Sequence, residues 1–143
     1  MNAAGRHQWT EDYPSFERIS EDVLSGNAYI ICDADGSVAT YAYITTEPEP
    51  AYTGICGKWH SDGEYVVIHR LAVAARFRGR GTGRKMLEKA EQLYAGKHIR
   101  SIRVDTNHDN AEMLHILENT GYRRCGTVSY GTRGERIAFD KIL

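Results

Sequence analysis

The sequence has few cysteines, few prolines, no long hydrophobic run and no excess of charge of one sign. Its three cysteines, Cys32, Cys56 and Cys125, are too few and too irregularly spaced for a disulfide framework or a zinc knuckle. No apolar stretch reaches the length of a membrane span, and the first residues lack the apolar core of a signal peptide. The net charge of −1 argues against general nucleic-acid binding. We therefore expect a cytoplasmic protein with no nucleic-acid or membrane partner.

The length and composition are those of one soluble globular domain. The chain has 143 residues, of which 41% are hydrophobic and 26% are charged, so it can bury a substantial core. The sequence shows no internal repeat, no low-complexity segment and no linker. We expect residues 1–143 to form a single domain.

Apolar periodicity and turn signals divide the chain into strands and helices. Strands are expected at 28–33, 37–46, 65–73, 99–105, 122–130 and 135–142, and helices at 8–25, 84–97 and 109–120. The last helix carries an Asp-x-x-Glu capping box at Asp109 and Glu112. This order predicts a mixed α/β sheet with one right-handed parallel crossover, whose ligand site lies at the carboxyl ends of the strands.

A glycine-rich turn, Arg78-Gly79-Arg80-Gly81-Thr82-Gly83, joins the expected strand 65–73 to the expected helix 84–97. Backbone N–H groups of such a turn and of a helix N-terminus converge on one point and attract an anion. Four cations accompany them: Arg78, Arg80, Arg84 and Lys85. The spacing matches neither the nucleoside-triphosphatase loop nor the dinucleotide fingerprint. A pyrophosphate is the natural ligand, and the alternative is a turn that merely ends the strand.

The pattern Arg-x-x-Gly-x-Gly, at Arg78, Gly81 and Gly83, resembles the acyl-CoA loop of the GNAT superfamily of N-acyltransferases. Further short motifs in the same order extend the resemblance from about residue 8 to the end. They include Gly57-Lys58-Trp59, Val104-Asp105-Thr106, Asp109-Asn110 and Gly121-Tyr122. The closest resemblance is to a subgroup of small, largely uncharacterised bacterial GNAT proteins. It implies an α/β fold of the GNAT type, without the usual first strand and helix.

The resemblance also implies a co-substrate and its binding residues. Acetyl-CoA would donate an acetyl group to an amine acceptor by direct attack in a ternary complex. The pyrophosphate would lie on the glycine turn, and the pantetheine arm would follow the strand backbone. The implied cofactor-binding residues are Leu71, Ala72, Val73, Arg78, Gly79, Arg80, Gly81, Thr82, Gly83, Arg84 and Asn110. For Asn110, the alternative is a polar residue that only starts the following helix.

Two residues are candidates for the general base. Strand alternation predicts that His69 lies on one face with Leu71 and Val73, beside the cofactor-binding backbone. An imidazole has a suitable pKa for taking a proton from an amine, although His69 also fits a purely structural role. Glu64 matches the glutamate that many GNAT enzymes use early in this strand. Its parity is opposite to that of His69, and its alternative role is a solvated charge at the strand end.

The general acid has no obvious candidate. The position of the usual GNAT tyrosine, seven residues after Asn110, is Leu117. Possible substitutes are Tyr130, Tyr122, Cys125 and His115, of which Tyr130 is the preferred candidate. Tyr122 and Cys125 fit packing roles better, and the thiolate of coenzyme A can also leave without an acid.

Several residues can form the acceptor side of the site. Aromatic and acidic residues that can line an acceptor pocket are Trp9, Tyr52, Trp59, Glu47 and Glu49. No metal is expected, because the spacing of the histidines and aspartates matches no common ligand pattern. The acceptor is an amine-bearing small molecule or protein, and a homodimer is compatible with the resemblance.

The rival functions are a non-catalytic acyl-CoA-binding homologue or regulatory subunit and, less favoured, a nucleotide phosphate-binding module.

Overall fold

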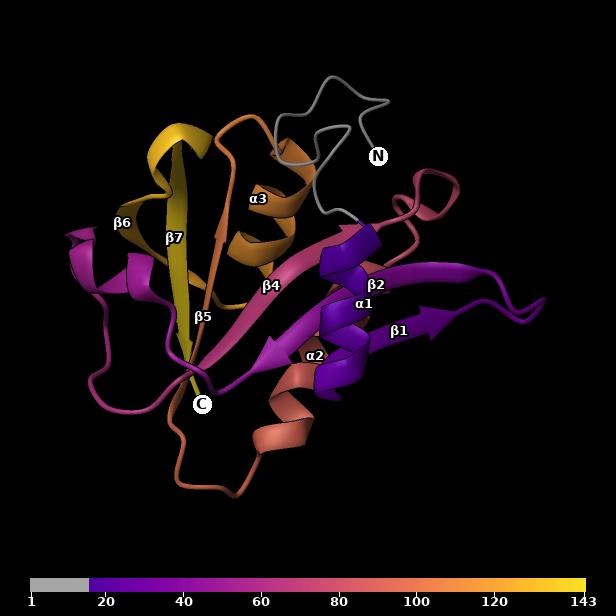
Figure 1. Cartoon of the computed structure of the whole chain (residues 1–143), viewed down its shortest axis with the longest axis horizontal. Coiled ribbons are helices and arrows are strands. Elements are labelled where there is room, and N and C mark those ends of the chain that lie inside the picture. Colours follow the sequence, from indigo (N-terminus) through magenta and orange to yellow (C-terminus); the bar gives the residue numbers. More distant parts are fainter. Residues whose placement is uncertain (1–15) are drawn as a thin grey trace.

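The computed structural model describes residues 16–143 (Figure 1). In chain order the elements are α1 (Phe16–Ser25), β1 (Ala28–Cys32), β2 (Val38–Thr45), η1 (Pro50–Gly54), β3 (Cys56–Gly57), β4 (Val66–Val73), η2 (Ala75–Phe77), α2 (Thr82–Tyr94), β5 (Ser101–Thr106), α3 (Ala111–Asn119), β6 (Arg123–Ser129), η3 (Gly131–Arg133) and β7 (Glu135–Ile142). Three expectations lie outside the described residues: a helix start near residue 8, the role of Trp9, and a missing first strand and helix.

One seven-stranded sheet organises the described residues, with the strand order β1-β2-β4-β5-β7-β6-β3. The pair β4–β5 is parallel, and the other neighbouring pairs are antiparallel. The parallel pair is joined by the crossover helix α2, as the order of elements predicted. The predicted mixed α/β sheet is thereby confirmed.

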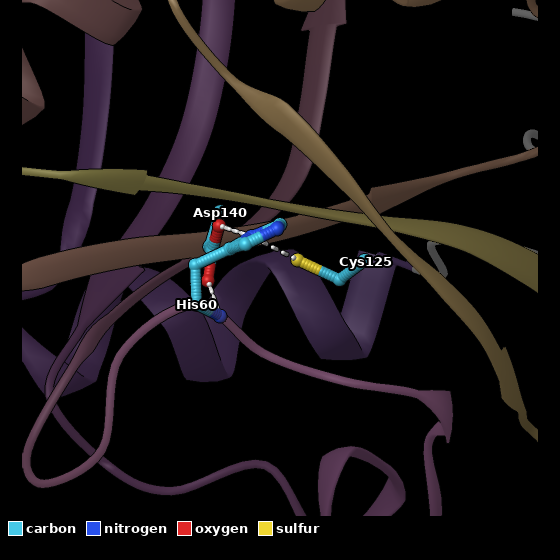
Figure 2. A group of neighbouring side chains, drawn as sticks. All are labelled: His60, Cys125 and Asp140. Atoms are coloured by element: carbon cyan, nitrogen blue, oxygen red, sulfur yellow. Dashed lines mark hydrogen bonds and ion pairs between the residues drawn. The ribbon is translucent and has the colours of Figure 1, made fainter.

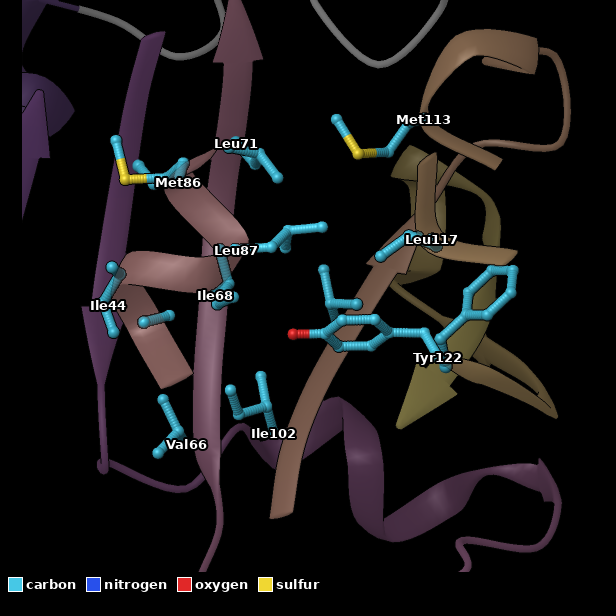
Figure 3. Close-up of a cluster of buried hydrophobic side chains, with 14 of the residues drawn as sticks. Ile44, Val66, Ile68, Leu71, Met86, Leu87, Ile102, Met113, Leu117 and Tyr122 are labelled. Carbon is cyan, nitrogen blue, oxygen red and sulfur yellow. The ribbon is translucent and has the colours of Figure 1, made fainter. Parts of the chain in front are cut away.

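The main core lies between one face of the sheet and the helices α2 and α3 (Figure 3). Met86 and Leu87 from α2 and Leu117 from α3 are fully buried there against Ile68 and Ile102 of the central strands. A smaller cluster lies on the opposite face, where the segment between β2 and β4 packs on strands β4, β6 and β7. Its buried members are Tyr52, Val67, Cys125, Val128 and Ala138. Helix α1 lies on this second face, across β1 and β2 (Figure 1).

The parallel pairing of β4 with β5 is short. The ladder runs from Val66–Ile102 to Ile68–Val104, although β4 continues to Val73 and β5 to Thr106. Figure 1 shows the two strands separating toward their carboxyl ends. Within the described residues, the end of β4 therefore has a strand partner only on the β2 side. Backbone groups on the other side are available to a ligand.

The structure corrects two predicted details. Asn110, rather than Asp109, caps α3: its side chain accepts a hydrogen bond from the Met113 N–H at 3.3 Å. Both residue types are good N-caps, so the sequence alone does not choose between them. The short strand β3 falls outside the ranges in which strands were expected. It pairs with β6 where Gly57 faces Gly126, and a Cβ on either glycine would overlap the backbone of the other strand.

Candidate active site

The glycine turn leads directly into α2 and has the backbone geometry of an anion site. Gly79 and Gly81 adopt left-handed conformations with φ of 77° and 80°. The first hydrogen bond of α2 runs from the Lys85 N–H to the Gly81 carbonyl at 3.0 Å. The N–H groups of Thr82, Gly83 and Arg84 therefore precede that bond and have no partner within the helix. A helix start with open donors and a partial positive charge favours a phosphate oxygen.

A pocket of about 300 Å³ opens at this turn. It is lined by Val73, Phe77, Arg78, Gly79, Gly81, Thr82, Gly83, Arg84, Glu112, His115, Ile116, Asn119 and Thr120. Thr82 Oγ1 is buried and has no hydrogen-bond partner within the described part of the chain. A Cβ on Gly83 would lie 3.2 Å from side-chain atoms of Val73 and Ile116, so glycine allows α2 to start close to α3. Open N–H groups beside an unpartnered hydroxyl fit an anionic phosphate group.

The predicted ring of four cations is only partly present at this pocket. Arg78 and Arg84 line it, and Arg78 Nε lies 3.8 Å from the Glu112 carboxylate. Arg80 instead lies over the Phe77 ring, 5.6 Å from its centroid. Lys85 lines a different pocket, between α2 and β1. The candidate site therefore offers backbone donors and two arginines instead of a surrounding cluster of charge.

Helix α3 supplies pocket residues that were not expected to bind the cofactor, among them His115, which the sequence had offered only as a candidate acid. Glu112, His115, Ile116 and Asn119 recur at helical spacing, which was the available signal. Leu71, Ala72, Arg80 and Asn110 were expected to bind the cofactor but do not line this pocket. The side chain of Leu71 lies in the main core, but its expected contact is through the backbone, so all four stay predictions.

A β-bulge in β4 changes the predicted facing of its residues. Tyr43 of β2 pairs with His69, and Tyr41 pairs with Ala72, so Arg70 and Leu71 together oppose the single residue Ala42. The extra residue reverses the alternation. Leu71 therefore joins the main core with Ile68, whereas His69 contacts Tyr43 and Glu49 on the opposite face. The prediction that His69 and Leu71 share a face was wrong, because strict alternation cannot anticipate an inserted residue.

His69 is largely buried and has an acidic neighbour. Its side chain is 18% exposed, and its Nε2 lies 3.8 Å from Glu49 Oε1. Burial lowers the pKa of His69 below its usual 6.5, and Arg70 acts in the same direction. Asp105 and Glu49 oppose this effect. A lowered pKa leaves the imidazole neutral near pH 7, which is the form that accepts a proton.

A buried carboxylate, Asp105 at the end of β5, joins two tyrosines. Its Oδ2 accepts hydrogen bonds from the hydroxyls of Tyr52 and Tyr130, both at 2.7 Å. Its Oδ1 lies 3.6 Å from Arg136 Nη1. Burial, followed by the charge of Asp105, raises the pKa of Tyr130 far above 10. A tyrosinate beside this carboxylate would be unfavourable, which argues against Tyr130 as a proton donor.

The other acid and base candidates lie apart from His69. Glu64 is 66% exposed in the turn before β4, where its carboxylate is 3.5 Å from His98 Nε2. Tyr122 is packed in the main core, and burial raises its pKa. Burial raises the pKa of Cys125 to about 12, which disfavours its reactive thiolate. His115 lines the pocket on α3 and contacts the Asn119 side chain.

His60, Cys125 and Asp140 form a cluster that sequence reasoning missed, because they come from three separate segments (Figure 2). Asp140 is fully buried and accepts hydrogen bonds from the His60 backbone N–H and from Nδ1, both at 2.7 Å. Cys125 Sγ lies 3.3 Å from the same Nδ1. A nucleophilic triad needs the thiol and the carboxylate on different ring nitrogens. The donor types are ones that zinc accepts, and the hydrogen bonds to Asp140 anchor the 58–61 loop on the sheet.

The acceptor-side aromatics also have structural contacts. The indole N–H of Trp59 donates to the Tyr52 carbonyl at 3.0 Å, and the two rings pack with centroids 4.9 Å apart. The Arg103 guanidinium lies between the rings of Trp59 and Tyr65, 4.3 and 4.0 Å from their centroids. Glu47 is exposed, whereas Glu49 is half-buried beside His69. Of the expected acceptor residues, Tyr52 and Glu49 thus lie in the His69 and Asp105 neighbourhood.

Comparison with known proteins agrees with this architecture. The model of the Acetyltransferase (GNAT) family matches residues 3–122, and the chain belongs to this family. A GNAT-family acetyltransferase from Streptococcus agalactiae, known from its crystal structure, is 38% identical to it. That match covers 99% of this chain and 80% of the other, with a TM-score of 0.83. No curated protein matches the chain significantly.

More distant solved structures share the fold. An IAA acetyltransferase from Bacillus cereus is 21% identical, covers 92% of this chain and 87% of its own, and has a TM-score of 0.69. The NatB acetyltransferase complex bound to CoA and MES is 17% identical, with coverages of 95% and 86% and a TM-score of 0.71. None of the described helices is long and apolar enough to cross a membrane.

Proposed function

We propose that this protein is an N-acetyltransferase that transfers an acetyl group from acetyl-CoA to an amine by direct attack in a ternary complex. One observation carries the proposal: β4 holds His69 and then runs, beyond its last pairing with β5, into the glycine turn and its pocket. Base and anion site therefore lie on one continuous segment. Membership in a family of acetyltransferases supports the same reaction.

The co-substrate would be held largely by backbone groups. The open N–H groups of Thr82, Gly83 and Arg84 suit its pyrophosphate, with Arg78 beside them. The backbone of residues 71–73, which lacks a β5 partner, suits the amide groups of the pantetheine arm. The bound group supplies the activated acetyl thioester. The residues of this chain bind and orient it.

His69 would act as the general base. It takes a proton from the acceptor amine, directly or through one water, as the N–C bond forms and the C–S bond of the thioester breaks. The thiolate leaves unaided, because a thiol has a pKa of about 8.5, well below about 10.4 for an alkylamine. Holding both reactants together supplies much of the rate enhancement. Neither Tyr130 nor Glu64 has a role in this scheme.

The acceptor side would favour a cationic amine. Glu49 and Asp105 place two carboxylates near His69, and Arg136 offsets one of them. Such a surface attracts an ammonium group before it loses its proton. The 58–61 loop, anchored by Asp140, holds this side of the site in place.

The experiment combines binding and turnover. Thermal unfolding is measured with acetyl-CoA, CoA and ATP, because a ligand of the folded state raises the midpoint. CoA release is then followed with a panel of amines for the wild type and for His69→Gln. A shift with acetyl-CoA and CoA, together with amine-dependent CoA release that His69→Gln abolishes, is expected. A shift with ATP but not with CoA would contradict the proposal.

One observation favours a second function, a non-catalytic acyl-CoA-binding homologue or regulatory subunit. Leu117 replaces the usual GNAT tyrosine and is fully buried in the main core, so it offers no proton. A midpoint shift with acetyl-CoA, without CoA release for any amine, would identify this function.

A further inference from the structure

Arg70 has a strained backbone in the middle of a strand. Its φ of 54° makes it the one non-glycine residue with a positive φ among residues 16–143. A side chain in this conformation costs free energy, and such residues persist where their surroundings over-determine them. Glycine is the usual residue at such a bulge position. The bulge alone therefore does not explain why position 70 carries an arginine.

A buried ion pair holds Arg70 in place. Its Nε and Nη2 donate to the two carboxylate oxygens of Asp22 on α1, at 2.8 and 2.6 Å. The two side chains are 9% and 3% exposed. The Tyr41 hydroxyl donates to the same carboxylate at 2.6 Å, and the guanidinium lies 4.9 Å from the Tyr43 ring centroid. A bidentate pair with a third donor fixes direction as well as distance.

The bulge decides how His69 relates to the rest of β4. It puts His69 on the face opposite Leu71, just before the segment 71–73. The ladder to β5 has already ended at Ile68, so β5 does not hold this part of the strand. The contacts of Arg70 with α1 and β2 replace that restraint.

We infer that the Asp22–Arg70 ion pair is a positioning device, which holds the β4 bulge and thereby fixes the imidazole of His69 relative to the backbone of residues 71–73. The inference rests on the proposed function for its kinetic meaning, because His69 is the base in that proposal. Its geometric content is independent of turnover. Asp22 and Arg70 are positioning residues that act through His69.

Single substitutions would confuse this role with simple stability, because removing one partner leaves an uncompensated buried charge. Two double variants avoid this: D22N/R70A and D22N/R70G. Both remove the two charges, and they differ only by a Cβ at position 70. Glycine adopts the left-handed conformation at position 70 without strain, whereas alanine favours a change of the backbone to another conformation.

The first readout is the titration of the His69 ring followed by NMR, which needs no substrate. The charged and titratable groups that act on His69 are Asp105, Arg70, Glu49 and Asp22. Both variants change the same two of them. A higher His69 pKa in D22N/R70A than in D22N/R70G therefore reports a displaced backbone and a more exposed ring. Identical titrations in two folded variants would overturn the inference.

The second readout is kinetic. A shift of about 1 Å in a reacting group can cost about 100-fold in rate. We expect kcat to fall about tenfold or more in D22N/R70A and to recover severalfold in D22N/R70G, with little change in the KM for acetyl-CoA. Equal kcat in both variants, or a loss expressed only in that KM, would overturn it.

Unfolded variants and an inactive wild type lead to different conclusions. If neither double variant folds, Tyr41→Phe removes one hydrogen bond to Asp22 and must shift the His69 titration in the same direction. An unchanged titration in folded Tyr41→Phe would assign the ion pair to stability alone and overturn the inference. If the wild type transfers no acetyl group, the proposed function fails, while the NMR comparison still decides the geometric claim.

Discussion

The Tyr130 hydroxyl donates a 2.7 Å hydrogen bond to Asp105 Oδ2, the same oxygen that accepts the Tyr52 hydroxyl. Two tyrosines from separate segments, Tyr52 of η1 and Tyr130 after β6, are thus fixed by one carboxylate on β5. This arrangement makes Tyr130 a structural partner of Asp105, because its proton is already committed and its pKa is raised.

Tyr130→Phe and Tyr52→Phe should therefore behave alike. Each removes one donor to a charged group and is expected to destabilise the fold by about 1–3 kcal/mol. A general acid would contribute a factor of about 100 or more to the rate. We expect kcat to fall less than tenfold in both variants, measured by CoA release. A selective loss of about 100-fold in Tyr130→Phe alone would restore Tyr130 as the acid.

The pH dependence of the reaction should report His69. Its lowered pKa predicts that kcat/KM rises with pH through a midpoint below 6.5 and then levels off. His69→Gln should remove this limb and lower the rate by about 100-fold or more. Glu64→Gln, in an exposed side chain, is the matched control and should keep both rate and limb. Loss of the limb in Glu64→Gln instead would assign the base to Glu64.

The same pKa shift predicts a change in stability with pH. His69 is protonated more readily in the unfolded chain, at about 6.5, than in the folded protein. Between the folded pKa and 6.5 the unfolded state binds more protons, so the free energy of unfolding rises with pH. Urea unfolding across this window should show a shallower slope for His69→Gln than for the wild type. Identical slopes would contradict a lowered pKa at His69.

The glycine turn can be separated from general backbone strain by a matched pair. Gly81 and Gly36 have φ of 80° and 87°, and a Cβ on either meets nothing within 4 Å. Gly81→Ala and Gly36→Ala should each destabilise by roughly 1–2 kcal/mol. Only Gly81→Ala should also reduce the rise in the unfolding midpoint with acetyl-CoA. An equal rise in both variants would exclude the turn from the binding site.

The three cysteines should differ in reactivity. Cys32 and Cys56 are exposed, whereas Cys125 is buried and its pKa is raised to about 12. Iodoacetamide at pH 8, followed by mass spectrometry, should modify Cys32 and Cys56 first. Asp140→Asn, which weakens the anchor of the 58–61 loop, should speed the labelling of Cys125. Fast labelling of Cys125 in the wild type would contradict its assignment as an inert packing residue.

The features that depend on local sequence were predictable. Gly79, Gly81 and the helix after them form a local unit, so the turn and helix start of the candidate anion site followed from their own residues. Asp105 and Tyr52 were both visible as residues, but their pairing depends on which strands become neighbours. The bulge at Arg70 was not predictable, because its conformation is held by Asp22, which lies 48 positions away. Without the bulge, strand alternation would place His69 and Leu71 on one face, as the sequence predicted.

Within residues 16–143, three register pairs between β4 and β5 are the only strand pairing that joins the two halves of the sheet, β1-β2-β4 and β5-β7-β6-β3. Packing on both faces adds to this connection: α2 and α3 pack across both halves through the main core, and Val67 of β4 packs with Val128 and Ala138 on the opposite face. The β4–β5 pairing is thus a short connection within the sheet, and α2 and α3 cover it on one face. A molecule lying along the end of β4 that β5 does not pair would bind the strand through its own amide groups, in the position that a further strand would take. Binding of this molecule would make the protein more rigid in the region where the reaction is proposed to occur.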